Sequence, residues 1–175
     1  VDITNYCLHA FGQPMHAFDL ARLGDTVVVR TGRPGERLTT LDGLDRAVPD
    51  DAVVIADASR PVAFAGIMGG ADTEVSDDTT DILLEVANFS PKRVRRARRA
   101  LGLGTDASQR FERGVDPEVT PLALSEAVAL LEKLAGGKLA AEPLDVRAPQ
   151  PSRPRVTLRV RRVRQLLGVD VNADA

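Results

Sequence analysis

The order of strand-like and helix-like segments constrains the fold more than any other feature of this 175-residue sequence. Short runs rich in β-branched residues occupy 26–30, 52–56, 61–65 and 81–86, and turns containing Gly, Pro or Asp separate them. Runs of this length bounded by turn residues are typical of β-strands. The first half of the chain is therefore predicted to be mainly strands.

Two helical patterns follow residue 90. Ser90 can cap a helix that has Pro91 at its first position and Gly102 as its stop signal, which predicts a helix over 91–101. A second helix is predicted from Pro117, capped by Asp116, to the Gly-Gly pair at 136–137. Its apolar stripe consists of Leu124, Ala127, Val128, Leu131 and Leu134. Strands followed by helices are consistent with an α+β fold.

The last part of the sequence indicates a domain boundary. Residues 143–154 are rich in Pro, Ala, Ser and Arg, which is typical of a linker. After it, 156–160 is predicted to be a strand and 163–168 a short helix. The sequence is therefore divided into a first domain over 1–142, a linker over 143–154 and the start of a further domain over 155–175.

Composition excludes several classes of protein. No apolar run approaches the ~20 residues that a transmembrane helix needs, and the first residues lack the pattern of a signal peptide. The single cysteine, Cys7, forms no internal disulfide and fits a reducing cytoplasm. Two histidines and one cysteine give no metal-ligand spacing, so no metal site is predicted.

Charge is unevenly distributed along the chain. Residues 1–91 carry a net charge of −9, whereas residues 92–113 carry +6, and 151–175 carry +4. Positive segments in an acidic background are found in proteins that bind polyanions, and they also occur as ordinary solvated surface. Charge alone leaves both interpretations open.

The more basic segment, 92–99, runs directly into a loop with glycines at 102 and 104 and hydroxyl side chains at 105 and 108. This loop follows a predicted helix and lacks the Gly-Lys-Ser/Thr ending of a phosphate-binding loop, so nucleotide binding is not predicted. Gly102 serves as a helix stop, and Thr105, Asp106 and Ser108 are typical of a hydrogen-bonded turn.

Three positions depart from their local pattern. His16 lies among apolar residues, Gly69 and Gly70 remove side chains next to a strand, and Glu85 interrupts the apolar run 82–87. Strand alternation puts Leu83, Glu85 and Ala87 on one face, so apolar neighbours are expected around the carboxylate. Each feature also fits an ordinary structural role: a hydrogen-bonded histidine, a turn, or a glutamate that faces water.

Taken together, these stretches resemble the editing domain of the bacterial phenylalanyl-tRNA synthetase β subunit. The resemblance extends from residue 1 to about 137 through motifs in the same order, and it is weaker after the linker. The stretches that carry it include Gly-Gln-Pro-Met-His-Ala-Phe-Asp at 12–19, Ala-Gly-Ile-Met-Gly-Gly at 65–70, Leu-Glu at 84–85 and Gly-Thr-Asp-Ala-Ser at 104–108.

The resemblance implies an α+β fold with mixed sheets and helices packed on them, and hydrolysis of tyrosine that is wrongly attached to the phenylalanine tRNA. Glu85 would recognise the tyrosine hydroxyl, and Gly69 and Ala107 would leave room for the ring. Thr105, Asn5 and His16 would line the ester side, where His16 would orient or activate water. Outward-facing arginines of 91–101 would contact tRNA phosphates, namely Arg95, Arg96, Arg98 and Arg99.

The resemblance also implies the setting of this reaction. The editing reaction would need no metal or organic cofactor, whereas the parent ligase would use ATP and Mg²⁺ and assemble with an α subunit as an α2β2 tetramer in the cytoplasm. Two alternatives stay open: a non-catalytic module that binds RNA or protein, and a free-standing hydrolase that edits in trans.

Overall fold

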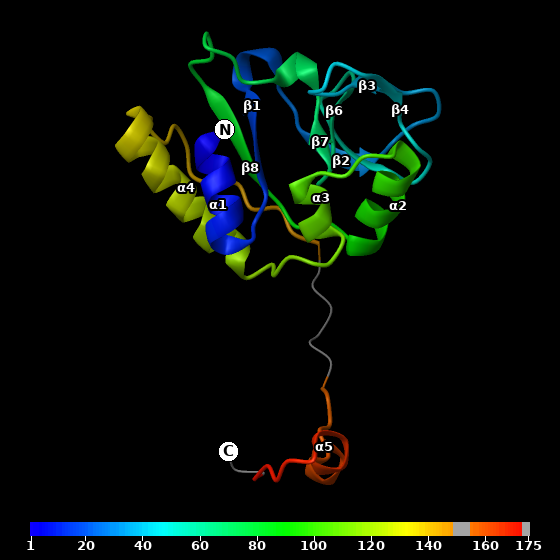
Figure 1. The fold of residues 1–175 in the computed structure, drawn as a ribbon. Coiled ribbons are helices and arrows are strands. Elements are labelled where there is room, and N and C mark those ends of the chain that lie inside the picture. The colour runs from blue at the N-terminus through cyan, green and yellow to red at the C-terminus, as the bar shows by residue number, and fades with distance from the viewer. Residues whose placement is uncertain (149–154, 173–175) are drawn as a thin grey trace. The chain divides into compact units, whose positions relative to one another are not determined.

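The computed structural model describes residues 1–148 and 155–172, and it divides into two compact units (Figure 1). The first unit spans Val1–Ala140 and the second Ala141–Ala175. None of the helices in the described residues has the length and apolarity needed to cross a membrane. The predicted linker at 143–154 lies partly outside the described residues, as do the last three residues of the chain.

The centre of the first unit is a four-stranded antiparallel sheet in the order β2-β5-β6-β7. Its strands are β2 (Val28–Thr31), β5 (Val53–Ala56), β6 (Pro61–Phe64) and β7 (Met68–Gly69). The tight β5–β6 turn is held by Asp57, whose carboxylate accepts hydrogen bonds from the backbone N–H groups of Ser59 and Arg60. Strand β6 is buried along its whole length, so the sheet is covered on both faces.

A separate two-stranded antiparallel ribbon joins β1 (Met15–Asp19) to β8 (Ile82–Val86). This pairing brings together segments that lie far apart in the sequence, and it sets His16 directly opposite Glu85. A third antiparallel pair, β3 (Arg37–Thr39) and β4 (Asp45–Ala47), forms a hairpin. Short 3-10 helices follow β1 (Leu20–Arg22) and β7 (Ala71–Thr73).

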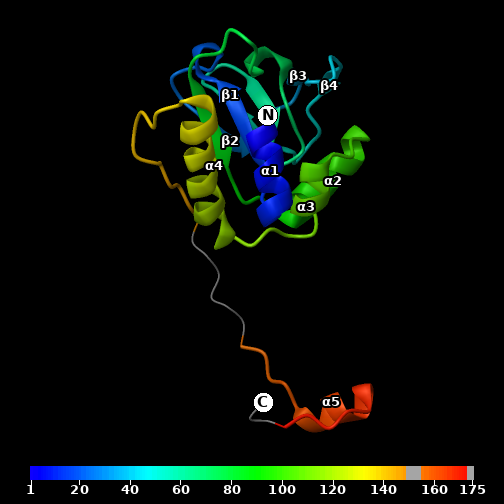
Figure 2. The ribbon, with the colours of Figure 1, turned by 60° about the vertical axis from the view of Figure 1, so that its left-hand side comes forward.

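Helices cover the ribbon and the sheet separately. Helices α1 (Asp2–Phe11) and α4 (Val119–Ala135) pack against each other on the side of β1 and β8 (Figures 1 and 2). Helices α2 (Pro91–Leu101) and α3 (Asp106–Phe111) lie together on the other side of the unit. The second unit contains α5 (Val160–Leu167).

Two hydrophobic clusters meet at the central sheet. Val54 and Phe64 face a cluster that includes Val94 of α2 and Phe111 of α3, while Ile55 and Ala63 face a cluster that includes Phe18 of β1. Because successive side chains of a strand point to opposite faces, each strand contributes to both clusters. The sheet is thus sandwiched between the α2–α3 pair and the β1–β8 ribbon.

The α+β class is confirmed, and so are strands within 52–56, 61–65 and 81–86 and the helix 91–101; the strand predicted over 26–30 forms over Val28–Thr31. Several details are corrected. Helix α4 begins at Val119, because the Asp116 carboxylate accepts a hydrogen bond from the Glu118 N–H in a turn before the helix. Helix α3 replaces the predicted loop, so two helices after residue 90 were too few. Residues 156–159 form no strand, and α5 begins at Val160.

Candidate functional site

A cavity opens between the β1–β8 ribbon, the β6–β7 turn and the start of α3. Its wall is largely apolar and aromatic, with Phe64, Phe89 and Phe111 among its lining residues. His16 and Glu85 are the titratable side chains among these lining residues. The wall combines aromatic surface with two convergent polar groups, as small-molecule sites commonly do.

The size of the cavity limits what can enter it. Its volume is about 70 Å³. This is space for roughly five waters at ~10–15 Å³ each, and it is about half of the ~150 Å³ of an engineered cavity that takes up benzene. An aromatic ring therefore enters only if the lining side chains move or part of the ring stays outside, and a nucleotide is far too large.

The β1–β8 pairing places the two polar groups. His16 and Glu85 are Cα partners in the antiparallel register, as are Phe18 and Leu83. Directly opposite residues of antiparallel strands have Cβ atoms ~4.5–5.5 Å apart and project from the same face. Leu83 and Glu85 were predicted to share one face of their strand. His16 and Phe18 of the other strand lie on that same face of the ribbon.

The imidazole of His16 is enclosed. It packs edge-on against Phe18, with ring centroids 4.5 Å apart and an interplanar angle of 81°. Its Nε2 atom is buried and has no hydrogen-bond partner in the described part of the chain. Burial lowers the pKa of His16 to about 4, so the ring is uncharged near neutral pH.

Gly69 makes this position of the ring possible. A Cβ atom on Gly69 would lie 2.4 Å from His16 Cε1 and 2.6 Å from Nε2, far inside van der Waals contact. The resemblance predicts that Gly69 leaves room for a bound ring, but the space beside it is filled by the protein's own imidazole. The absence of a side chain at Gly69 therefore makes room for the His16 ring, and this ring forms part of the cavity wall.

Glu85 is half-buried, and among the described residues no hydrogen bond or ion pair reaches its carboxyl group. Burial raises the pKa of Glu85 to about 7. The group is therefore a mixture of acid and carboxylate near neutral pH, without a partner for either form. A carboxyl group without a protein partner can hydrogen-bond a ligand that brings a hydroxyl.

Gln13 fixes the end of the ribbon; it lies in the 12–19 stretch that carries the resemblance, but no role was predicted for it. Its buried amide Nε2 donates to the carbonyl oxygens of Pro14 (3.0 Å) and Ala87 (2.9 Å), and its Oε1 accepts from the Thr120 hydroxyl (3.2 Å). One side chain thus connects the residues before β1, the residues after β8 and helix α4. Its only signal in the sequence is a polar residue between Gly12 and Pro14, which many surface turns share.

Helix α3 supplies Ala107 to the cavity wall. Thr105 is the cap of this helix: its hydroxyl accepts from the Ser108 N–H at 3.1 Å and donates to the Ile67 carbonyl oxygen at 2.7 Å. Ser108 completes a capping box, which explains why a Thr-Asp-Ala-Ser stretch begins a helix here. Thr105 is thus adjacent to the cavity wall but does not line it.

Of the predicted site residues, the cavity brings together His16, Glu85, Gly69 and Ala107. Asn5 is on the exposed surface of α1 and does not line the cavity. The described residues contain no group of three or more His, Cys, Asp or Glu side chains placed to hold a metal ion.

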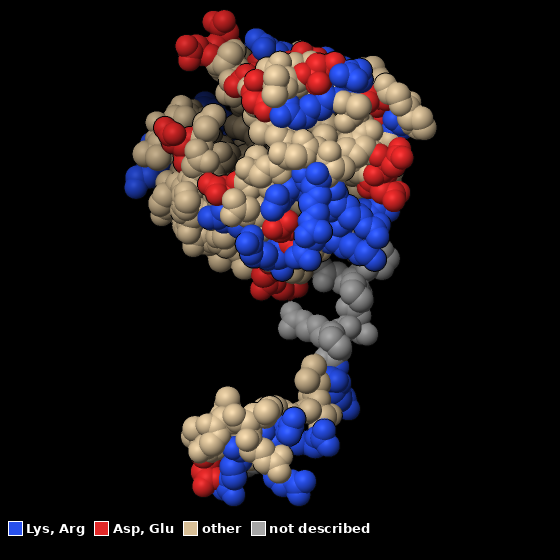
Figure 3. All heavy atoms as spheres, turned by 45° about the vertical axis from the view of Figure 1, so that its right-hand side comes forward, with Lys and Arg blue, Asp and Glu red and all other residues tan. Residues whose placement is uncertain are grey.

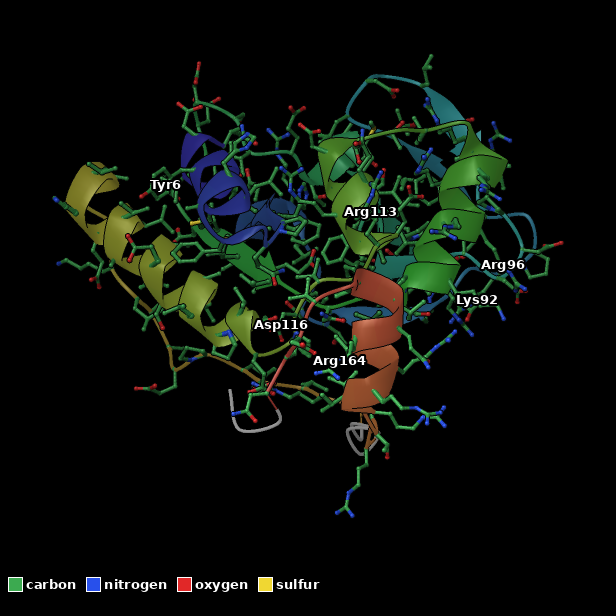
Figure 4. All side chains as sticks on the ribbon, turned by 60° about the horizontal axis from the view of Figure 1, so that its bottom comes forward. Tyr6, Lys92, Arg96, Arg113, Asp116 and Arg164 are labelled. Carbon is green, nitrogen blue, oxygen red and sulfur yellow. The ribbon has the colours of Figure 1, made fainter. Side chains whose placement is uncertain are left out.

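The predicted arginine surface lies on α2. Arg95, Arg96 and Arg99 are exposed, whereas Arg98 is half-buried and forms an ion pair with Glu112 (Nε to Oε2, 3.1 Å). The prediction that all arginines of this helix project outward is therefore wrong for Arg98, which ties α2 to the end of α3. Figure 4 shows Lys92 and Arg96 projecting from the outer side of α2.

Comparisons with known proteins identify relatives of this chain. A family model described as the B3/4 domain matches residues 1–136. Phenylalanine–tRNA ligase β subunits from Salinibacter ruber and Anaeromyxobacter dehalogenans are 47% and 49% identical to the chain; each match covers 99% of it, but only 21% and 22% of the relative. The chain thus spans about a fifth of the length of these curated relatives.

A solved structure supports the fold. The crystal structure of an N-terminal fragment of the phenylalanyl-tRNA synthetase β subunit from Pyrococcus horikoshii superposes with a TM-score of 0.55 at 14% identity, covering 98% of this chain and 51% of that fragment. At this identity the likeness concerns the fold alone. Since the family model covers well over half of the sequence, the chain belongs to the B3/4 domain family, as it occurs in phenylalanine–tRNA ligase β subunits.

Proposed function

We propose that the cavity is an editing site, which hydrolyses the ester bond of tyrosine wrongly attached to the phenylalanine tRNA. Water adds to the ester carbonyl, and the products are free tyrosine and a tRNA with its terminal hydroxyl restored. The observation that carries this proposal is Glu85, a carboxyl group without a protein partner on the wall of an aromatic cavity.

The need for such a site follows from the limits of discrimination by size. An apolar pocket built for phenylalanine rejects a ring with one added hydroxyl only about a hundredfold. A second site that requires the hydroxyl adds its own selectivity. A phenylalanine ring would leave the Glu85 carboxyl desolvated and unpaired, at a cost of ~1–3 kcal/mol, which is roughly a 5- to 150-fold preference for tyrosine.

The pKa of Glu85 suits this role. A permanently charged carboxylate would be costly to enclose, whereas a group with a pKa of about 7 is readily available as the neutral acid. The acid donates a hydrogen bond to the phenol oxygen, and the carboxylate accepts one from the phenol O–H. Either form pairs with tyrosine, and neither pairs with phenylalanine.

His16 orients the attacking water in this proposal. A neutral imidazole offers one accepting and one donating nitrogen, and the low pKa of His16 keeps the ring neutral at physiological pH. An ester is activated enough that positioning contributes much of the rate, with help from the terminal ribose hydroxyl of the tRNA. Asn5 and Thr105 lie outside the cavity wall, so we assign them no contact with the amino-acid side chain.

The wider setting is inferred from the relatives. We propose that the chain is part of a phenylalanine–tRNA ligase β subunit that works in the cytoplasm with tRNA(Phe) and a synthetase α subunit. ATP and Mg²⁺ belong to the charging reaction of that ligase, and we place neither in this cavity.

The test uses the full-length protein that carries this chain, in its natural assembly. Deacylation of Tyr-tRNA(Phe) and Phe-tRNA(Phe) is measured for the wild type, for Glu85→Gln and for the control Glu74→Gln, whose carboxylate is exposed. We expect Glu85→Gln to lose most of the preference for tyrosine and the control to keep it. Unchanged discrimination in Glu85→Gln, or no deacylation by the wild type, would refute the proposal.

A further inference from the structure

The outer face of α2 carries a stripe of four cations, which we call the basic stripe: Lys92, Arg95, Arg96 and Arg99. Their spacing of i, i+3, i+4 and i+7 places them on one side of a helix. The buried residues of α2, Val94 and Ala97, lie on the opposite side. At 1.5 Å of rise per residue, the stripe is about 10 Å long.

All four side chains of the basic stripe are exposed, and none forms an ion pair within the described residues. Glu112, at the end of α3, forms its ion pair with Arg98, a half-buried residue of the same helix. Figure 3 shows the result as a continuous patch of Lys and Arg atoms over α2. The patch stands out because residues 1–91 of the same unit carry a net charge of −9.

Local stability does not account for the basic stripe. Cations at i, i+3 and i+4 repel one another along a helix. Lys92 also lies in the first turn of α2, where the helix dipole disfavours a positive charge and where no acidic residue is present. Arg99, in the last turn, is favoured by the same dipole, so the unfavourable part is the position of Lys92 and the repulsion among the four cations, which a bound anion would relieve.

The basic stripe is also close to the proposed editing site. Helix α2 packs against α3, and the Arg98–Glu112 ion pair joins α2 to the end of α3. Ala107, in the first turn of α3, lines the cavity. A polyanion on α2 would thus lie next to the helix that forms one wall of the cavity.

We propose that the basic stripe binds the phosphate backbone of the RNA whose aminoacylated end enters the cavity. This inference rests on the proposed editing function. A length of about 10 Å corresponds to roughly three nucleotides of a stacked strand at 3.4 Å each. Interface composition does not separate RNA from an acidic protein, since arginine is enriched and lysine depleted in protein interfaces. RNA is favoured because the basic stripe is next to the helix that forms one wall of the proposed editing site.

The experiment measures the affinity of the full-length assembled protein for uncharged tRNA over a range of salt concentrations. The variant is Arg96→Gln/Arg99→Gln, in which glutamine preserves helix propensity. The matched control is Lys133→Gln/Lys138→Gln, which removes two exposed charges at and just beyond the C-terminal end of α4, on the opposite side of the unit (Figures 1 and 2).

We expect the arginine variant to flatten the slope of log affinity against log salt by roughly 0.7–0.9 for each phosphate that is no longer neutralised, or about 1.4–1.8 in total. The affinities for tRNA(Phe) and for a non-cognate tRNA should fall by the same factor, because phosphate contacts carry no sequence information. The control should keep the wild-type slope.

An unchanged slope in the arginine variant, or an equal change in the control, would overturn the proposal. Loss of subunit assembly in the arginine variant with an unchanged tRNA slope would assign the stripe to a protein partner and overturn it as well. Binding of uncharged tRNA does not depend on hydrolysis. If the arginine variant flattens the slope but the wild type does not deacylate Tyr-tRNA(Phe), the editing function alone is refuted. Normal deacylation with an unchanged slope would refute the phosphate contact alone.

Discussion

Replacing Gly69 with alanine should displace His16 and disable the site. The added Cβ would lie 2.4 Å from the imidazole Cε1 atom, whereas ordinary contacts begin at 3.4 Å. The ring must therefore move by about 1 Å. Phe18, which is completely buried, packs against the ring and restricts this movement.

The magnitude follows from two effects. Overpacking a well-packed interior costs typically ~1–3 kcal/mol. Displacement of a positioning group by ~1 Å reduces a reaction that depends on geometry about a hundredfold. We expect Gly69→Ala to lower deacylation of Tyr-tRNA(Phe) by about two orders of magnitude and to lower the stability of the β1–β8 ribbon by ~1–3 kcal/mol.

The assay combines single-turnover deacylation with hydrogen exchange of the β1 and β8 amides in the full-length protein. Gly104→Ala is the matched control, because its Cβ would meet nothing closer than an Arg98 nitrogen at 3.9 Å. A double-mutant cycle adds His16→Ala, which removes the obstructing ring. Gly69→Ala should then cost close to nothing in stability, whereas an equal cost with and without the His16 ring would refute the explanation.

The titration of Glu85, the size of Ala107 and the hydrogen bonds of Gln13 can be tested separately. Between pH 4.5 and about 7 the folded protein retains a proton on Glu85 that the unfolded chain releases. The stabilisation from this proton is complete below pH 4.5 and is lost as the pH rises through about 7. Thermal unfolding should therefore show that the free energy of unfolding of Glu85→Gln rises by up to about 3 kcal/mol relative to that of the wild type across this range. His16 has the opposite pH dependence, since its contribution to stability is complete above pH 6.5 and is lost as the pH falls through about 4. If the stability of the wild type matched that of Glu85→Gln at every pH, the raised pKa assigned to Glu85 would be contradicted. Ala107→Trp should fill the cavity and abolish deacylation while near-UV and far-UV circular dichroism stay close to the wild type, and retained activity would remove Ala107 from the substrate path. Gln13→Leu should destabilise the protein by ~1–3 kcal/mol, because the Ala87 carbonyl and the Thr120 hydroxyl lose their partner; an unchanged unfolding midpoint would show that Gln13 does not hold the ribbon.

Strands β2, β5 and β6 of the central sheet could be predicted because β-branched runs and their turn residues are local signals, whereas β7, with only Met68 and Gly69, gave no such signal. Helix α1 could not, since Asp2–Phe11 contains several residues of low helix propensity and packs against α4 and β1. Strand β1 was missed for a similar reason: its pairing partner, β8, lies far along the chain. Helix α3 has six residues, and the capping box that starts it is also typical of a turn.

In the candidate site, too, the local features could be predicted from the sequence, whereas the contacts between distant residues could not. The break in apolar pattern at Glu85 and the apolar setting of His16 were visible in the sequence, but their direct opposition depends on the β1–β8 register. The reason for Gly69 emerged only when the imidazole was placed against it. The arginine surface could be predicted from charge. The inward orientation of the Arg98 side chain could not, because it depends on an ion pair with Glu112 at the end of α3.

The most direct test of the central claim is a crystal structure of the full-length assembled protein with a non-hydrolysable analogue of tyrosyl-adenosine. We expect the phenol ring in the cavity, with its oxygen ~2.5–3.0 Å from a carboxyl oxygen of Glu85 and the ester analogue on the His16 side. A phenol group bound away from Glu85, or an empty cavity with the analogue bound elsewhere, would contradict the editing function proposed for the cavity.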